Sequence, residues 1–236
     1  MLRQLIYNLF YKTVYPILHR PLIINTVNYK ETEGILAKAM NLATSNRLEG
    51  DYLEFGVYQG ESFVTAYKFS KDYYGLKSMN FYAFDSFQGQ PPLSGVDAEG
   101  FQHFRQGQYY CSLDDFKKII AKKGLDQKRV IIVPGWYKDT LNEETKKKLP
   151  LKKAAIVMVD CDLYESTVAV LDFITDYLQD GTILIFDAWF CFRGNPNRGE
   201  HRAFQEWLKK NPQITARQYQ KYALYGNSFI ITVNSQ

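Results

Sequence analysis

Carboxylates follow three of the strongly apolar runs of this chain. They are Asp85, the pair Asp160 and Asp162, and Asp187. Side chains that follow parallel strands meet at one edge of a sheet, and ligands bind in the crevice at that edge. A carboxylate there can accept hydrogen bonds from ribose hydroxyls, and two carboxylates can hold Mg²⁺, which prefers oxygen ligands. A buried carboxylate without a partner would be costly, so these positions are expected to form a ligand site.

A turn with two glycines comes before these carboxylates. Residues 51–62 read DYLEFGVYQGES, which predicts a strand, a turn with Gly56 and Gly60, and the start of a helix. Glycine lets the backbone approach a ligand closely because it has no Cβ. The G-x-x-x-G spacing lacks the G-x-G-x-x-G of dinucleotide enzymes, so the turn alone is a weak signal. Asp85 follows at about the interval at which an acid meets a ribose hydroxyl; alternatively, it caps the next turn.

Short apolar runs alternate with segments of helical periodicity. The expected strands are 52–57, 80–84, 130–133, 154–159, 182–186, 216–222 and 229–233. The expected helices are 31–43, one from 61, 113–123, 141–149, 166–178 and 200–210. This alternation predicts an α/β fold with a doubly wound, mostly parallel sheet of seven strands. Between Ser86 and Tyr110 lies a stretch rich in Gly, Gln and Pro, whose length is typical of a lid or binding loop.

Composition excludes several classes of protein. The chain has 236 residues and a formal net charge of +4, which is too small an excess to indicate a nucleic-acid partner. Its three cysteines form no C-x-x-C pair, which argues against a disulfide framework or a zinc site and favours a cytoplasmic location. No uninterrupted apolar stretch reaches the roughly 20 residues that a membrane span needs.

Residues 1–45 are expected to form an N-terminal helical appendage or lid, and residues 46–236 the main domain. Between Leu2 and Leu18, apolar residues recur at helical spacing and basic residues are interleaved. This amphipathic helix is expected to pack on the domain or on a partner subunit of a homo-oligomer; the alternative is that residues 1–20 lie on a membrane surface. A secretory signal fits poorly because polar residues interrupt the apolar region.

Five segments together resemble the class I S-adenosylmethionine-dependent O-methyltransferases, and most closely the macrocin O-methyltransferase family. In chain order they are EFGVYQGES from Glu54, FDSFQG followed by PP from Phe84, GWYKDTL from Gly135, VDCDLYEST from Val159 and GTILIFDAW from Gly181. Their order matches the family's, and they lie between about residue 50 and about residue 207. The resemblance implies a Rossmann-like methyltransferase fold and S-adenosylmethionine as the cofactor. It is not specific for one acceptor.

The resemblance also implies roles for individual residues. The methionine part of the cofactor is expected at the glycine turn, the ribose at Asp85 and the adenine at Trp136. The residues expected to bind the cofactor are Glu54, Gly56, Val57, Tyr58, Gly60, Ser62, Asp85, Ser86, Phe87, Trp136 and Asp160. Asp160 and Asp187 are expected to hold Mg²⁺; the alternative is that they cap helices or orient the cofactor.

Two positions depart from the family's pattern. Ala188 stands where related enzymes usually have Asp or Asn as a further metal ligand, and Leu163 stands where catechol-type enzymes have a catalytic lysine. If no metal is bound, a side chain must take the proton of the acceptor hydroxyl. The candidates for this catalytic base are Asp162, His201 and His103.

The leading hypothesis is therefore an S-adenosylmethionine-dependent O-methyltransferase that acts on a hydroxyl of a sugar or glycosylated small metabolite. The alternative is a homologue that binds the cofactor without turnover, or a scaffold, which Ala188 and Leu163 motivate. A nicotinamide-dependent oxidoreductase is disfavoured because its glycine pattern is absent.

Overall fold

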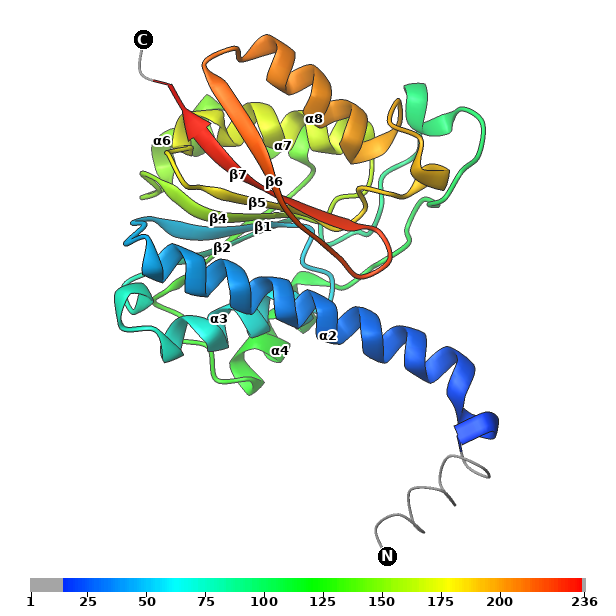
Figure 1. The fold of residues 1–236 in the computed structure, drawn as a ribbon, viewed down its shortest axis with the longest axis horizontal. Coiled ribbons are helices and arrows are strands. Elements are labelled where there is room, and N and C mark those ends of the chain that lie inside the picture. The colour runs from blue at the N-terminus through cyan, green and yellow to red at the C-terminus, as the bar shows by residue number, and fades with distance from the viewer. Residues whose placement is uncertain (1–14, 235–236) are drawn as a thin grey trace, which may run out of the picture.

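Seven strands form one sheet in the order β3-β2-β1-β4-β5-β7-β6 in the computed structural model, which describes residues 15–234 (Figure 1). The strands are β1 Asp51–Phe55, β2 Phe81–Asp85, β3 Val130–Pro134, β4 Ala154–Val159, β5 Ile183–Phe186, β6 Ile214–Tyr222 and β7 Gly226–Val233. Strands β1 to β5 are parallel to one another, and β7 pairs antiparallel with both β5 and β6. The predicted mostly parallel seven-stranded sheet is confirmed.

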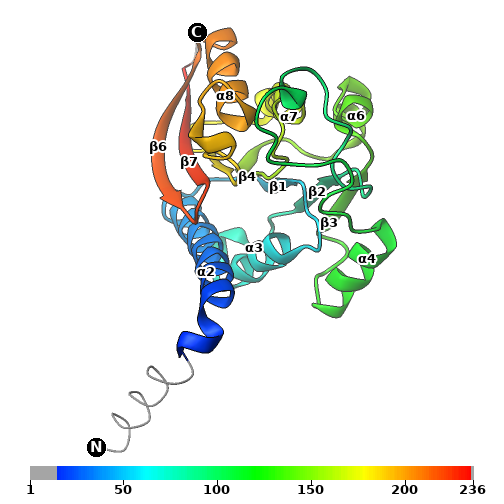
Figure 2. The same ribbon diagram turned by 90° about the vertical axis from the view of Figure 1, so that its right-hand side faces the viewer.

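Helices cover both faces of this sheet. The helices α2 Tyr15–Ser45, α3 Glu61–Asp72 and α4 Leu113–Lys122 lie on one face (Figures 1 and 2). On the other face lie α6 Glu143–Lys148, α7 Tyr164–Ile174 and α8 Gly199–Lys210. The shorter elements are α5 Tyr137–Thr140, η2 Tyr74–Leu76, η3 Gly95–Ala98, η4 Thr175–Tyr177 and η5 Phe192–Gly194.

The helix expected over 141–149 is α6 in the structure, and a separate short helix, α5, precedes it. Helix α5 ends at Thr140, and α6 begins at Glu143. The break has a local cause, because the side chain of Asn142 accepts a hydrogen bond from the backbone N–H of Thr145 at 2.9 Å and so caps a new helix.

A hydrophobic core lies on each side of the sheet. All six residues of β4 are buried, as its continuous apolar run predicts for a strand covered on both faces. On the α3 and α4 side, the ring of Phe63 packs edge-on against Phe116 with centroids 5.8 Å apart. On the opposite side, the rings of Phe55 and Phe84 stack across neighbouring strands at 4.4 Å. These rings anchor the strands whose ends form the site described below.

Helix α2 is longer than the helix expected over 31–43. Its second half packs into the core through Ile35, Leu36, Ala39, Met40 and Ala43, all of which are buried. Its first half extends away from the sheet (Figure 1). Most of the amphipathic helix expected between Leu2 and Leu18 lies outside the described residues, because the description begins at residue 15. Within residues 15–234, none of the helices has the length and apolar character that crossing a membrane requires.

Candidate active site

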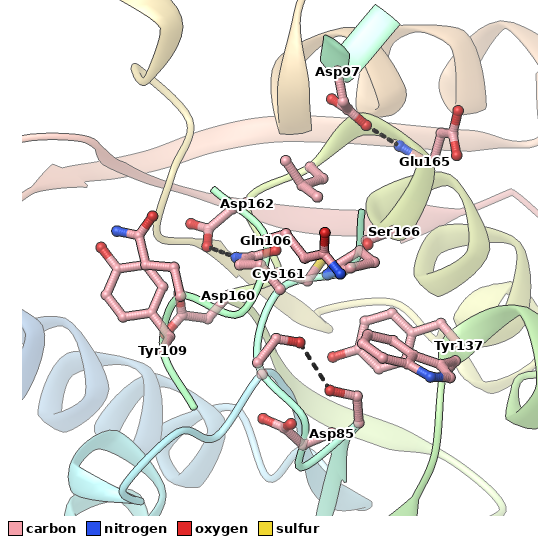
Figure 3. A pocket seen from close by; sticks show the side chains of 18 of the residues that line it. Asp85, Asp97, Gln106, Tyr109, Tyr137, Asp160, Cys161, Asp162, Glu165 and Ser166 are labelled. Atoms are coloured by element: carbon pink, nitrogen blue, oxygen red, sulfur yellow. Dashed lines mark hydrogen bonds between the residues drawn. The ribbon is translucent and has the colours of Figure 1, made fainter. Parts of the chain in front are cut away.

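A cavity of about 790 Å³ lies at the carboxyl ends of the parallel strands (Figure 3). Its volume is within the range of about 300–1,000 Å³ that is usual for small-molecule sites. The strand ends form one wall, and the loop between Ser86 and Tyr110 and the start of α7 form the others. Eight of the expected site residues line it: Gly56, Tyr58, Asp85, Ser86, Trp136, Asp160, Asp162 and Asp187.

A second cavity of about 450 Å³ lies between α2, α3 and the sheet. Its lining includes the expected residues Val57 and Ser62, together with Thr32, Glu33 and Leu36 of α2. The two cavities share Tyr58, Asp160 and Asp187 in their linings. The carboxylates after β4 and β5 therefore stand where the two cavities meet.

Asp85 joins the end of β2 to the turn after β1. Its Oδ2 accepts hydrogen bonds from the backbone N–H groups of Val57 at 2.8 Å and Tyr58 at 3.3 Å. Its Oδ1 accepts from the N–H of Phe87 at 2.7 Å. Burial raises the pKa of Asp85, and these three backbone hydrogen bonds oppose that rise. The side chain thus fixes the turn and the start of the long loop while still lining the cavity.

The glycine turn is required by a neighbouring strand rather than by a ligand alone. Gly56 has a φ of +89°, and a Cβ there would lie 1.9 Å from the carbonyl oxygen of Asp160. Gly60 has a φ of +76° at the start of α3, where a Cβ would lie 3.0 Å from the ring of Phe116. Neither Gly60 nor Phe87, whose ring packs against Phe116 at 5.4 Å, is part of the cavity lining.

Glu54 lies behind the turn and supports it. The residue is fully buried and does not line either cavity. Its carboxyl group accepts hydrogen bonds from the hydroxyl of Tyr52 and from Ser62 Oγ, the latter at 2.7 Å. Burial raises the pKa of Glu54 to about 8 despite these hydrogen bonds.

Four acidic side chains gather at the ends of β4 and β5: Asp160, Asp162, Asp187 and Glu200. Burial and the charge of Asp187 raise the pKa of Asp160 well above its usual range. Burial raises the pKa of Asp162 to about 8, again with help from Asp187. Burial and the charges of Asp162 and Asp187 raise the pKa of Glu200 well above its usual range. Such a cluster favours a cationic ligand, because a positive charge would stabilise the ionised carboxylates.

Few oxygens of the acidic cluster are free to bind a metal ion, because hydrogen bonds engage some of them. The Tyr222 hydroxyl donates to Asp187 Oδ1 at 3.1 Å, and the N–H of Ala188 donates to Glu200 Oε2 at 2.9 Å. Glu200 Oε1 is buried and has no hydrogen-bond partner within the described part of the chain. Within residues 15–234, no three His, Cys, Asp or Glu side chains are arranged to hold a metal ion together. Asp160 and Asp187 remain, and Mg²⁺ is commonly bound by one or two carboxylates with water completing its shell.

The long loop is tied to the site by side chains that the sequence did not single out. Gln90 donates a hydrogen bond to Asp162 Oδ2, and the backbone of Gln90 pairs with residues 107 and 108 at 2.9 Å. Asp97 accepts hydrogen bonds from the N–H groups of Tyr164 at 3.0 Å and Glu165 at 3.1 Å. Asp97 therefore caps α7 from a distant part of the chain. The sequence held one signal for such a cap. Leu163, the residue before α7, has no side-chain oxygen, so another residue must cap this helix.

Other lining residues received no role from the sequence: three lie in the long loop, and three lie within the family-like segments that begin at Gly135 and Val159. They are Gln106, Gln108, Tyr109, Tyr137, Lys138 and Glu165.

The two candidate histidines lie apart from the cavity. The ring of His201 stacks on Trp189 at 4.2 Å, and its Nε2 lies 3.0 Å from Gln205 Nε2. The ring of His103 lies 4.9 Å from Phe104 and 5.5 Å from Tyr225. Neither histidine lines either cavity. Of the three candidates for the base, only Asp162 does.

Comparison with known proteins agrees with this architecture. The O-methyltransferase NovP superposes with a TM-score of 0.70 at 22% identity, covering 86% of this chain and 80% of that one. CalS11, a calicheamicin methyltransferase, superposes with a TM-score of 0.69 at 21% identity, covering 95% of this chain and 85% of that one. At these identities the likeness concerns the fold.

Sequence relatives include two named O-methyltransferases. The 8-demethyl-8-(2,3-dimethoxy-alpha-L-rhamnosyl)-tetracenomycin-C 4'-O-methyltransferase of Streptomyces olivaceus is 30% identical over 142 residues, which is 58% of this chain and 52% of that protein. The mycinamicin III 3''-O-methyltransferase of Micromonospora griseorubida is 27% identical over 173 residues, which is 71% of this chain and 66% of that protein. The chain thus spans between about half and two thirds of the length of the curated relatives it matches.

The sequence model of one family, described as macrocin-O-methyltransferase (TylF), matches residues 20–215, which is most of the chain. The matched range includes the glycine turn, all the acidic residues of the cluster and the long loop. The chain belongs to the macrocin O-methyltransferase family.

Proposed function

We propose that this protein transfers the methyl group of S-adenosylmethionine to a hydroxyl of a sugar in a glycosylated small metabolite. The observation that carries the proposal is that the larger cavity brings together Asp85 and Trp136, expected at the cofactor, and Asp162, a candidate for the base. The family membership and the relatives' names support it, since those names include a rhamnosyl-tetracenomycin and a mycinamicin O-methyltransferase.

The strand ends suit the parts of the cofactor. Asp85 presents a carboxylate to the ribose hydroxyls, and Trp136 offers an aromatic face to the adenine. The sulfonium and ammonium charges of the cofactor would face the acidic cluster where the cavities meet, at Asp160 and Asp187. The second cavity, with the hydroxyl of Ser62 in its wall, has room for the methionine part.

Methyl transfer is an in-line displacement at the sulfonium methyl carbon. A bond forms between that carbon and the acceptor oxygen, the carbon–sulfur bond breaks, and S-adenosylhomocysteine leaves with the electron pair. The protein must orient the two reactants and remove the hydroxyl proton. We assign the proton acceptor to Asp162, whose Oδ2 is held by Gln90 of the loop. The positive charge of the bound cofactor would oppose the rise in the pKa of Asp162 and favour the ionised form, which can take a proton.

The proposal includes a Mg²⁺ ion, with Asp160 and Asp187 as its protein ligands. Glu200 belongs to the same acidic cluster, and its buried Oε1, which has no hydrogen-bond partner among residues 15–234, supports a cation at this place. When bound, Mg²⁺ would lower the pKa of the acceptor hydroxyl and orient it. Asp162 would remain the residue that takes the proton.

The test is methyl transfer from radiolabelled S-adenosylmethionine to a panel of glycosides, compared with the same sugars' deoxy analogues. We expect label in the glycosides, none in analogues that lack the hydroxyl, and calorimetric binding of S-adenosylhomocysteine. Tight binding of S-adenosylhomocysteine without transfer to any glycoside would favour the alternative of a cofactor-binding homologue without turnover. Absence of cofactor binding would reject both.

The homo-oligomer and the membrane contact expected for the N-terminal segment are also proposals. The first half of α2 extends away from the sheet, which supports a contact with a second subunit or with a membrane (Figure 1). Light scattering of the purified protein tests the oligomer. Co-sedimentation with anionic vesicles, with and without residues 1–20, tests the membrane contact.

A further inference from the structure

The backbone of Gln90 closes the neck of the long loop between Ser86 and Tyr110. Its N–H donates to the carbonyl oxygen of Gln108, and its carbonyl oxygen accepts from the N–H of Gly107, both at 2.9 Å. The neighbouring Gly89 has a φ of +77°, and a Cβ there would lie 2.8 Å from the carbonyl oxygens of both facing residues. The two sides of the neck are therefore pressed together, and the side chain of Gln90 starts from a fixed piece of backbone.

From this neck, the side chain of Gln90 reaches the proposed base. Gln90 is buried and lines the larger cavity, as Asp162 does. Its Nε2 donates a hydrogen bond to Asp162 Oδ2, drawn as a dashed line at Asp162 in Figure 3. Among residues 15–234, no other group donates a hydrogen bond to the carboxyl group of Asp162.

The backbone of Asp162 is held without the help of Gln90. Its φ of +65° lies in the left-handed region, which is unfavourable for a residue with a Cβ. The turn is closed by a hydrogen bond from the N–H of Leu163 to the carbonyl oxygen of Cys161 at 2.6 Å. The carbonyl oxygen of Asp162 faces Gly199, where a Cβ would lie only 3.2 Å from it. With the backbone fixed, the direction of the carboxyl group depends on its side-chain rotamer, which the hydrogen bond from Gln90 selects.

The two carboxyl oxygens of Asp162 are therefore not equivalent. Oδ2 is engaged by the amide of Gln90, whereas Oδ1 accepts no hydrogen bond within the described part of the chain. Oδ1 is the oxygen left for the acceptor hydroxyl. A general base must come within about 2.6–3.2 Å of the oxygen whose proton it takes, so the rotamer of Asp162 decides whether it can act.

We propose that Gln90 is a positioning residue for methyl transfer, whose amide holds Oδ2 of Asp162 so that Oδ1 meets the acceptor hydroxyl. Because this amide is carried by the neck of the loop, the base is completed only while the neck is closed. Opening of the loop would take Gln90 away and leave Asp162 free to turn, so closure of the loop over an acceptor and assembly of the base become one event. The inference rests on the proposed function and adds a residue that does not itself take the proton.

Gln90→Leu tests the inference, because leucine nearly keeps the size of the side chain and removes the amide. For a 4-nitrophenyl glycoside that the unaltered protein methylates, kcat should fall about tenfold to a hundredfold, since a misplaced catalytic group costs up to about that much. The KM of the glycoside and the Kd of S-adenosylhomocysteine should stay within about threefold. Gln88→Leu is the matched control, because Gln88 is exposed in the same loop and lines neither cavity, and it should leave all three values unchanged. An unchanged kcat in a folded Gln90→Leu overturns the inference while the proposed function stands.

A double-mutant cycle with Asp162→Asn separates positioning from a general structural effect. If Gln90 acts through Asp162, adding Gln90→Leu to Asp162→Asn should lower kcat by less than about threefold further. Losses of kcat that multiply would show that Gln90 acts independently of Asp162 and would overturn the inference.

Urea unfolding establishes that each variant is folded. If Gln90→Leu is not, Gln90→Glu takes its place, because glutamate has the same shape but cannot donate when ionised, and the same loss of kcat is expected. Absence of methyl transfer by the unaltered protein would instead reject the proposed function, and this inference with it.

Discussion

The carboxylate of Asp85 accepts a hydrogen bond from the backbone N–H of Val57 at 2.8 Å, which ties the end of β2 to the turn after β1. The other oxygen of Asp85 holds the N–H of Phe87 at 2.7 Å. One side chain therefore shapes the glycine turn and the root of the long loop, and it also faces the cavity. Its removal is expected to affect the cofactor both directly and through the turn.

Asp85→Ala should weaken binding of S-adenosylhomocysteine about tenfold to a hundredfold. A hydrogen bond that involves a charged group contributes about 1.5–3 kcal/mol, which corresponds to that range of Kd. Titration calorimetry measures the change. Asp172→Ala on the exposed side of α7 is the control and should leave the affinity unchanged. Unchanged affinity in Asp85→Ala would reject the assigned ribose contact.

Gly56→Ala should lower the free energy of unfolding by about 4 kcal/mol or more, as expected when a buried backbone clash forces a shift. The added Cβ would lie 1.9 Å from the carbonyl oxygen of Asp160. Gly124→Ala is a matched control, since Gly124 also has a positive φ of +76° but has no atom within 4 Å of the added Cβ. The control should lose only about 1–2 kcal/mol from backbone strain. Urea unfolding measures both, and equal losses would contradict the clash.

Asp162→Asn should lower kcat by about 10²–10⁴-fold, the usual contribution of a general base. The affinity for S-adenosylhomocysteine should change little, because the amide has nearly the same size and the cofactor contacts are assigned to other residues. His201→Gln is the comparison, because His201 stacks on Trp189 and lines neither cavity. If His201→Gln lost as much kcat as Asp162→Asn, the assignment of the base to Asp162 would be wrong.

Asp187→Asn should weaken Mn²⁺ binding, measured by electron paramagnetic resonance, at least tenfold, and EDTA should abolish methyl transfer by the unaltered protein. The amide keeps an oxygen that can accept from the Tyr222 hydroxyl at 3.1 Å, so the fold should be retained. Asp97→Asn is the control, because Asp97 is engaged by backbone N–H groups at the start of α7. Methyl transfer that withstands EDTA would remove magnesium from the proposal.

The sequence predicted the sheet and the carboxylates at its edge because both follow from short-range patterns. An apolar run such as β4 can be recognised without tertiary information, and Asp160 follows it directly. For Gly56 the sequence pointed to a ligand, and the structure adds a second reason for glycine at this position. Its lack of a Cβ admits the backbone of Asp160, and only the pairing of β1 with β4 reveals this contact.

The loop side of the larger cavity could not be predicted, since it depends on contacts far apart in the chain. Asp97 caps a helix that begins 67 residues later, and Gln90 reaches Asp162 across 72 residues. His201 and His103 were candidates for the base because imidazole can take a proton near neutral pH. Their aromatic neighbours, however, determine where these side chains lie. Residue type alone therefore could not show that both histidines lie outside the cavity linings.

Glu54→Gln should change how stability depends on pH. Burial raises the pKa of Glu54 to about 8 in the folded protein, whereas an unfolded glutamate titrates near about 4.3. Between these values the folded state holds a proton that the unfolded state has released, so stability is full below about pH 4.3 and falls as pH rises toward 8. The free energy of unfolding changes by at most about 1.4 kcal/mol per pH unit from this one group, and the glutamine variant, which cannot titrate, should lack this contribution.

Urea unfolding between pH 5 and 9 should therefore show the Glu54→Gln variant gaining stability relative to the unaltered protein as pH rises. The stability of Glu49→Gln, at an exposed position, should run parallel to that of the unaltered protein. Parallel curves for Glu54→Gln would mean that the buried carboxyl group behind the glycine turn is ionised throughout, with Tyr52 and Ser62 alone stabilising its charge.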